Sequence, residues 1–142
     1  MFKLNTSALI VLTIAFCAAS CNRVAKDPPH VTVDALLGKG AEFNGTDVSL
    51  AGCLQPSMHG LTIYACPPGD AGIPVLYANS MEPAHRSWLY SKAMQTGLDK
   101  KKPLMATLCG SYHATADGKD RWLEVVAFTV GDEHFDTGTT CR

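Results

Sequence analysis

The stretch Asp47-Val-Ser-Leu-Ala-Gly-Cys-Leu54 alternates apolar residues with small or polar ones. Val48, Leu50 and Leu54 fall on one face of an extended chain, because successive side chains of a β-strand point to opposite faces. A strand with a single apolar face is typical of an antiparallel sheet that covers a core on one side. We therefore predict that this segment opens a β-domain.

The same pattern returns further along the chain, between turn signals rich in glycine and proline. We predict strands over residues 47–54, 61–66, 73–78, 104–112 and 121–130. Pro74 places the third strand at an edge or at its own start, because proline cannot donate to a strand ladder. The predicted core comprises Val48, Leu50, Leu61, Ile63, Val75, Leu104, Leu108, Val126 and Phe128.

Two segments have helical spacing instead. Thr32 can cap a short helix over residues 33–37, which the two glycines that follow are expected to end. Residues 81–97 carry apolar side chains at helical intervals around Trp88. We expect this second helix to pack its apolar stripe against the strands.

Five strands with a helix between the third and the fourth is the order of the OB-fold, a small Greek-key barrel. Several motifs resemble those of the small exported OB-fold lipoproteins of Gram-negative bacteria. These motifs are the turn Phe43-Asn44-Gly45, the first strand Val48-x-Leu50-x-Gly52-x-Leu54, and the pair Leu108-x-Gly110-x-Tyr112 and Trp122-Leu-Glu-Val125.

The resemblance covers roughly residues 31–130 and implies a mainly β fold. The expected architecture is a five-stranded OB-fold-like Greek-key barrel with a short N-terminal helix and one helix between strands three and four, which would plug one end of the barrel. The resemblance implies a fold and no activity, because a fold does not fix a function.

The first twenty residues have the order of a secretory signal. One cation, Lys3, precedes an apolar run over residues 8–19, and Ser20 and Cys21 follow. A membrane-spanning anchor would need about 20 apolar residues, and this run is shorter. We predict that residues 1–20 are a cleaved signal peptide and that the working protein lies outside the inner membrane.

Ala18-Ala19-Ser20-Cys21 resembles the lipobox of bacterial lipoproteins, in which the cysteine is diacylated and becomes the new N-terminus. Ala18 departs from that pattern, where leucine is commonest, and the same triplet would also suit ordinary signal peptidase. We expect Cys21 to carry the lipid; without it, the protein would be soluble in the periplasm or secreted.

The membrane is then one expected partner, through the N-terminal lipid. Residues 21–30 are polar and rich in proline near their end, which fits a tether ahead of a single domain over residues 31–142. By similarity to lipoprotein sorting, Asn22 in place of an aspartate favours the outer membrane over the inner membrane.

Four cysteines remain once Cys17 is removed with the leader and Cys21 is lipidated: Cys53, Cys66, Cys109 and Cys141. An even number in an exported chain indicates two disulfides. Zinc is the competing interpretation, although the chain contains no CxxC and no HxxxH.

The pairing follows from an expected register. A plain hairpin centred near Ser57 would separate Cys53 and Cys66 by roughly 16 Å along the ladder, whereas a disulfide needs Cα atoms within about 7 Å. In an OB barrel, strands two and four run the same way, and the tail emerges near the end of strand one. We predict Cys66–Cys109 and Cys53–Cys141, although strand one lies between strands two and four.

Charge argues against a nucleic-acid partner. The whole chain has a net charge of −1, and loss of Lys3 makes the mature chain more negative. A domain that neutralises phosphates normally has a clear basic excess. The single basic cluster, residues 100–102, lies on the connector between a helix and a strand, so we expect no nucleic acid to bind.

No catalytic motif is present. The chain lacks G-x-S-x-G, and a Cys–His dyad would need a thiol that the disulfides remove. We predict that Glu124, in the last strand, faces solvent. We assign no catalytic residue and no cofactor, and expect a non-enzymatic module that binds an envelope protein, a glycan or a small ligand on its barrel.

The alternative is a periplasmic carrier of haem or metal that uses surface histidines. The candidates are His30, His59, His85, His113 and His134, none of which pairs with another at metal-binding spacing. The periplasmic haem chaperone of cytochrome c maturation also has a histidine near its C-terminus beside acidic and aromatic residues. Asp132-Glu133-His134-Phe135 is similar, but with the acids before the histidine.

Overall fold

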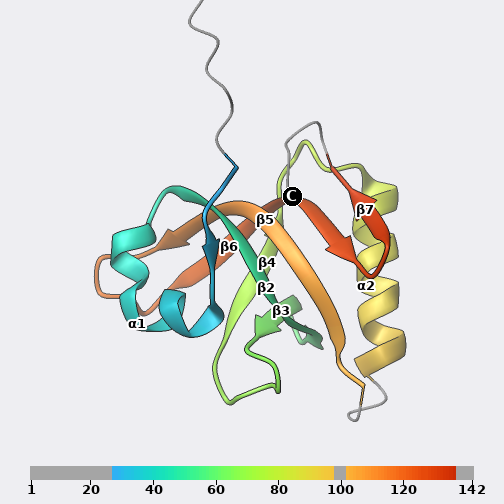
Figure 1. The fold of residues 1–142 in the computed structure, drawn as a ribbon, viewed down its shortest axis with the longest axis horizontal. Coiled ribbons are helices and arrows are strands. Elements are labelled where there is room, and N and C mark those ends of the chain that lie inside the picture. Colours follow the sequence, from blue (N-terminus) through green and yellow to red (C-terminus); the bar gives the residue numbers. More distant parts are fainter. Residues whose placement is uncertain (1–26, 98–101, 137–142) are drawn as a thin grey trace, which may run out of the picture.

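A computed structural model describes residues 27–97 and 102–136 of the chain. Five strands close into a barrel in the order β2-β3-β4-β6-β5, and β5 pairs back onto β2 (Figure 1). The elements are β1 (His30–Val31), α1 (Val33–Phe43), β2 (Thr46–Ser57), β3 (Gly60–Tyr64), β4 (Gly72–Tyr77), α2 (Pro83–Gly97), β5 (Leu104–Ala114), β6 (Arg121–Val130) and β7 (Glu133–Phe135).

The barrel pairings are antiparallel except for β4 with β6, which is parallel. One helix precedes the barrel and the other connects its third and fourth strands. The predicted mainly β fold is therefore confirmed, and this closed barrel is compatible with the OB-fold. None of the helices in the described residues has the length and apolar character needed to span a membrane.

Strand β2 is long because it serves two partners. Residues 46–54 pair with β5, and residues 53–57 pair with β3. Gly52 lies where the partner changes, and a Cβ there would stand 2.5 Å from the carbonyl oxygen of Tyr64. Only glycine allows so close an approach of two backbones.

The end of the predicted tether lies against the barrel. β1 pairs in parallel with β2, and the Ser49 amide donates to the Pro29 carbonyl at 2.9 Å. The rest of the predicted tether, like the signal peptide and Cys21, lies outside the described residues.

All but one of the predicted core residues are buried. The exception is Val126, which is only partly buried. Cys109 pairs with Ala127 and Gly110 pairs with Val125, so Val126 is an extra residue in β6. A bulge of this kind shifts the alternation by one residue, so Val125 and Phe128 face the core and the prediction for Val126 is wrong.

The helix α1 continues past the point where glycines were expected to end it. Thr32 caps its start, with Oγ1 accepting from the Ala35 amide at 3.1 Å as predicted. Lys39 has non-helical dihedral angles, and the helix bends there and runs on to Phe43. Gly40 lies directly against the Tyr112 hydroxyl, since a Cβ at Gly40 would be 2.5 Å from that oxygen. The glycines bend the helix over Tyr112 and do not stop it.

The two helices lie at opposite ends of the barrel, with β2 and β5 crossing between them (Figure 1). As predicted, α2 packs against one end: Leu89 and Ala93 are buried, and Trp88 is partly buried. A further strand, which the sequence analysis did not predict, follows the barrel: β7 pairs with β6 and places the Phe135 and Trp88 ring centroids 4.7 Å apart.

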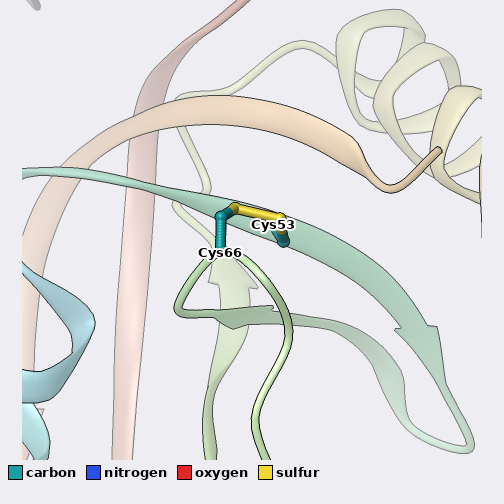
Figure 2. Close-up of a disulfide and its surroundings, with 2 residues drawn as sticks. All are labelled: Cys53 and Cys66. Carbon is teal, nitrogen blue, oxygen red and sulfur yellow. A yellow bond between two sulfur atoms is a disulfide. The ribbon is translucent and has the colours of Figure 1, made fainter. Parts of the chain in front are cut away.

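The disulfide pairing was predicted wrongly. Cys53 is bonded to Cys66, with Cα atoms 5.3 Å apart (Figure 2). The hairpin turns at residues 58–59, so Cys53 lies opposite Tyr64, the last residue of β3. The chain then leaves the ladder and turns back, which brings Cys66 beside Cys53. Both predicted pairs, Cys66–Cys109 and Cys53–Cys141, are thereby excluded.

Cys109 is also disulfide-bonded, and Cys141 lies outside the described residues.

Candidate binding face of the barrel

Four paired residues form a continuous row across the outside of the barrel. Asp47 on β2 pairs with Ser111 on β5, Ser111 pairs with Glu124 on β6, and Glu124 pairs with Leu76 on β4. We call this row, together with His113 and Trp122, the outer face. Strand neighbours share one side of a sheet, so the register alone brings together residues from four separate strands.

A second cross-strand pair extends the face. His113 on β5 pairs with Trp122 on β6, two residues along from the first row on each strand. Their rings stack with centroids 5.0 Å apart and planes inclined by 14°.

These side chains point outward because their neighbours along each strand point inward. Tyr112 separates Ser111 from His113 and is buried; Leu123 separates Trp122 from Glu124 and is also buried. Leu76 is 51% exposed despite being a large apolar residue, and the Glu124 side chain is 45% exposed. Glu124 therefore faces solvent, as predicted.

The polar groups of the face are partly engaged with one another. The Ser111 hydroxyl donates to Oδ1 of Asp47. His113 Nε2 lies 3.5 Å from Oε2 of Glu124 and has no hydrogen-bond partner among the described residues. These contacts link β2, β5 and β6 across the face.

The outer face carries two carboxylates and no lysine or arginine. Arg121, which precedes Trp122, instead donates to the Leu37 carbonyl of α1 at 3.2 Å. Lys119, in the β5–β6 turn, lies 3.5 Å from Asp117. Hydrogen bonds from the Thr115 side chain and the Lys119 amide hold the pKa of Asp117 below its ordinary value. The nearby cations are thus already engaged, and the face is acidic.

The face is open rather than hollow. Hollows of the described barrel are lined by other residues; one, of about 430 Å³, lies between the end of β2, the end of α2 and residues 68–69. A second, of about 350 Å³, lies between α1 and the β5–β6 turn. Enclosed sites are typical of small ligands, so an open face fits a larger partner better.

The histidines do not converge on a metal site. Across residues 27–97 and 102–136, no three His, Cys, Asp or Glu side chains lie close enough together to hold an ion. His134 interacts instead with Thr129 Oγ1 at 2.8 Å and with Asp136 at 3.1 Å. His85 lies beside Phe135 with ring centroids 4.9 Å apart, and His59 is in the β2–β3 turn. The predicted haem or metal carrier has no assembled ligand set in the described part of the chain and stays an untested prediction.

Of the predicted basic cluster, Lys102 is described and exposed, whereas the other two lysines lie outside the described residues. Lys102 is not one of the residues of the outer face.

Sequence reasoning identified Glu124, His113 and Trp122 separately but did not bring them together. The signal was present in the alternation, since an outward position lies on each side of every buried one. What the sequence lacks is the register that sets Asp47 and Leu76 in the same row, because strands far apart in the chain supply them.

Comparison of the chain with protein-family models, with curated proteins and with solved structures finds no match. The fold therefore rests on the topology of the barrel itself.

Proposed function

We propose that the chain is a lipid-anchored binding module of the periplasm, held at the outer membrane through Cys21. Its outer face binds a component of the cell envelope, either a protein or a glycan. This function includes no catalytic step. The proposal also places the chain among the small exported OB-fold lipoproteins that its motifs resemble.

The observation that carries the proposal is the row in which the half-exposed Leu76 pairs with Glu124 and continues to Asp47, with the stacked Trp122 ring in the next row. Aromatic and aliphatic side chains surrounded by polar ones are the usual composition of a recognition surface.

The rigidity of the barrel supports the same conclusion. A closed barrel has no exposed sheet edges along its closed strands, and the Cys53–Cys66 disulfide braces β2 against the turn after β3. A surface built on regular strands keeps its side chains in fixed positions. Such a face can bind a partner without first ordering itself.

A photo-cross-linking amino acid at Leu76 tests the binding function in intact cells. We expect a discrete adduct with an envelope protein or with an envelope glycan. The same probe at Glu82, which is exposed at 73% ahead of α2, is the matched control and should give no such adduct. Equal labelling at both positions, or no adduct at Leu76, would refute the assignment of the face.

The anchor has its own test. Cys21→Ser should move the protein from the membrane fraction to the soluble periplasmic fraction, because the thiol that receives the lipid is gone. A wild-type protein that is already soluble and has no acyl mass would show that the anchor is wrong, while leaving the binding face untouched.

A further inference from the structure

We propose that the outer face binds a basic segment of a protein partner, with one cation beside Asp47 and a second beside Glu124. This inference rests on the proposed binding function and names its ligand class. The argument uses charge, aromatic geometry and the spacing of the strands.

The charge of the outer face indicates the charge of its partner. Asp47 and Glu124 lie on either side of Ser111 in one row, and their row and the next contain no lysine or arginine. A complementary partner presents cations, because like charges placed opposite each other weaken association. A phosphate-bearing ligand is disfavoured for the same reason.

The neighbouring aromatic ring favours a cation as well. Trp122 lies next to Glu124 in the second row of the face, and its ring is held in place by stacking on His113. A lysine or arginine head group within about 6 Å of an indole face is attracted by the ring quadrupole. The side chain that pairs with Glu124 therefore has a second favourable contact.

Strand spacing sets the pattern of the segment. Adjacent strands lie about 4.8 Å apart, so Asp47 and Glu124, two strands apart, are separated by roughly 10 Å. A peptide in the polyproline II conformation rises about 3.1 Å per residue with three residues per turn, so cations three positions apart would lie on one side of it, about 9 Å apart, and match the two carboxylates. Leu76 lies one strand beyond Glu124, on the side where the segment continues after its second cation.

The openness of the face favours a protein over a small amine. Leu76 and the Glu124 side chain are about half exposed, and five hollows of the described barrel are lined by other residues. An extended segment crossing the strands would contact the whole row from Asp47 to Leu76 without needing a pocket.

A blocked peptide of sequence Gly-Lys-Ser-Ser-Arg-Leu-Gly is the probe, mixed with the full chain carrying Cys21→Ser to keep it soluble. Two-dimensional NMR with the labelled protein should show shifts at Asp47, Ser111, His113, Trp122, Glu124 and Leu76. The same peptide with both cations replaced by glutamate should cause none. Raising the salt should weaken the binding, since exposed charge pairs are screened.

The variant Asp47→Asn/Glu124→Gln should bind the basic peptide at least about fivefold more weakly, because exposed ion pairs contribute modestly each. The matched control Asp132→Asn/Glu133→Gln removes the same charge next to and within β7, away from the face, and should bind normally. An undisturbed spectrum elsewhere in each variant shows that the fold is retained.

Three outcomes would overturn the proposal: binding that survives the Asp47/Glu124 double change, equal binding of the acidic peptide, or no shifts on the face. If the peptide fails while cross-linking at Leu76 still captures an envelope component, the basic-segment proposal is wrong and the binding function stands. If neither gives a signal, both are wrong.

Discussion

Both ends of the barrel bury apolar side chains of a helix, Val33 and Leu36 from α1 and Leu89 and Ala93 from α2, but the contacts that accompany this burial differ. At the α1 end they are hydrogen bonds, since the Tyr112 hydroxyl donates to the Leu36 carbonyl at 3.3 Å and Arg121 donates to the Leu37 carbonyl. At the α2 end they are aromatic: the rings of Trp88 and Phe128 have centroids 6.0 Å apart, and those of Phe128 and Phe135 4.8 Å apart.

Hydrogen bonds and aromatic packing differ both in how much they stabilise the fold and in how strictly they fix direction. A hydrogen bond contributes about 1 kcal/mol net but fixes direction, whereas a buried aromatic side chain contributes several times more and is less directional. The outer face lies toward the α1 end, because Ser111 and His113 flank Tyr112 on β5. Directional contacts therefore add to packing beside the region that we assign to binding, whereas stacked aromatic rings add to packing at the other end.

The largest effect is expected at the α2 end. Phe128→Ala removes a fully buried ring that stacks against Trp88 and Phe135. We expect the free energy of unfolding to fall by about 3–5 kcal/mol, measured by urea denaturation. A loss below about 1 kcal/mol would show that this end is not held by packing.

The Cys53–Cys66 disulfide belongs to neither of these sets of end contacts, and we expect its removal to have the second-largest effect on stability. Cys53→Ser/Cys66→Ser opens a loop of sequence separation 13 and should lower the free energy of unfolding by about 3 kcal/mol. Non-reducing peptide mapping of the wild type should recover a Cys53–Cys66 fragment. Recovery of Cys66 linked to Cys109 instead would contradict the structure.

Trp88 should contribute less than Phe128 because its ring is only partly buried. Full burial would make Trp88→Ala cost about 3–5 kcal/mol, so we expect roughly 2 kcal/mol in a urea titration. The Lys92 ammonium lies 5.5 Å from the Trp88 ring centroid. Lys92→Gln is the control for that cation–π contact, and a loss as large as that of Trp88→Ala would place the effect in the charge instead of the ring.

Much of the barrel followed from the sequence because alternation is local. Val48, Leu50, Leu61 and Ile63 are buried as their spacing predicts. The turn before β2 has Asn44 at a φ of −56° and Gly45 at a φ of 74°, the dihedral angles for which a type II turn favours glycine at its second central position.

The incorrect predictions concern features that depend on contacts between distant parts of the chain, which local sequence patterns do not encode. The bulge at Val126 depends on the partner strand, since a Cβ on Gly110 would collide with the Glu124 carbonyl. Cys66 reaches Cys53 because β3 ends two residues before it, and the strand was expected to run on. The outer face needed the register of four strands, so its members could be recognised only singly.

At the α1 end, Tyr112→Phe removes one hydroxyl and keeps the ring. We expect the free energy of unfolding to fall by about 1–2 kcal/mol, because the carbonyl of the buried Leu36 loses the hydrogen bond that the Tyr112 hydroxyl donates. Hydrogen exchange of the α1 amides should rise as well, which a loss of packing alone at the α2 end would not cause. Tyr90→Phe on α2, at a residue 41% exposed, is the control and should change neither measurement.

The smallest expected effect is the loss of stability at alkaline pH that comes from Tyr77, a tyrosine at the α2 end. Burial raises the pKa of Tyr77 from 10.0 to about 12, with Arg86 lowering it in part and Tyr90 raising it slightly. The folded protein therefore holds the phenol proton more tightly than the unfolded chain does. The resulting stabilisation is complete below about pH 10 and is lost as the pH rises toward about 12.

Two pKa units would correspond to about 2.7 kcal/mol, but Tyr77 is partly exposed, so solvent screening reduces the expected loss to about 1 kcal/mol. The measurement is the free energy of unfolding in urea at about pH 9 and about pH 11.5, for the wild type and for Tyr77→Phe. The Tyr77 hydroxyl has no hydrogen-bond partner within the described part of the chain, so the variant removes the titrating group with little other change. The wild type should lose more stability than the variant across this interval, and equal losses would show that Tyr77 titrates normally.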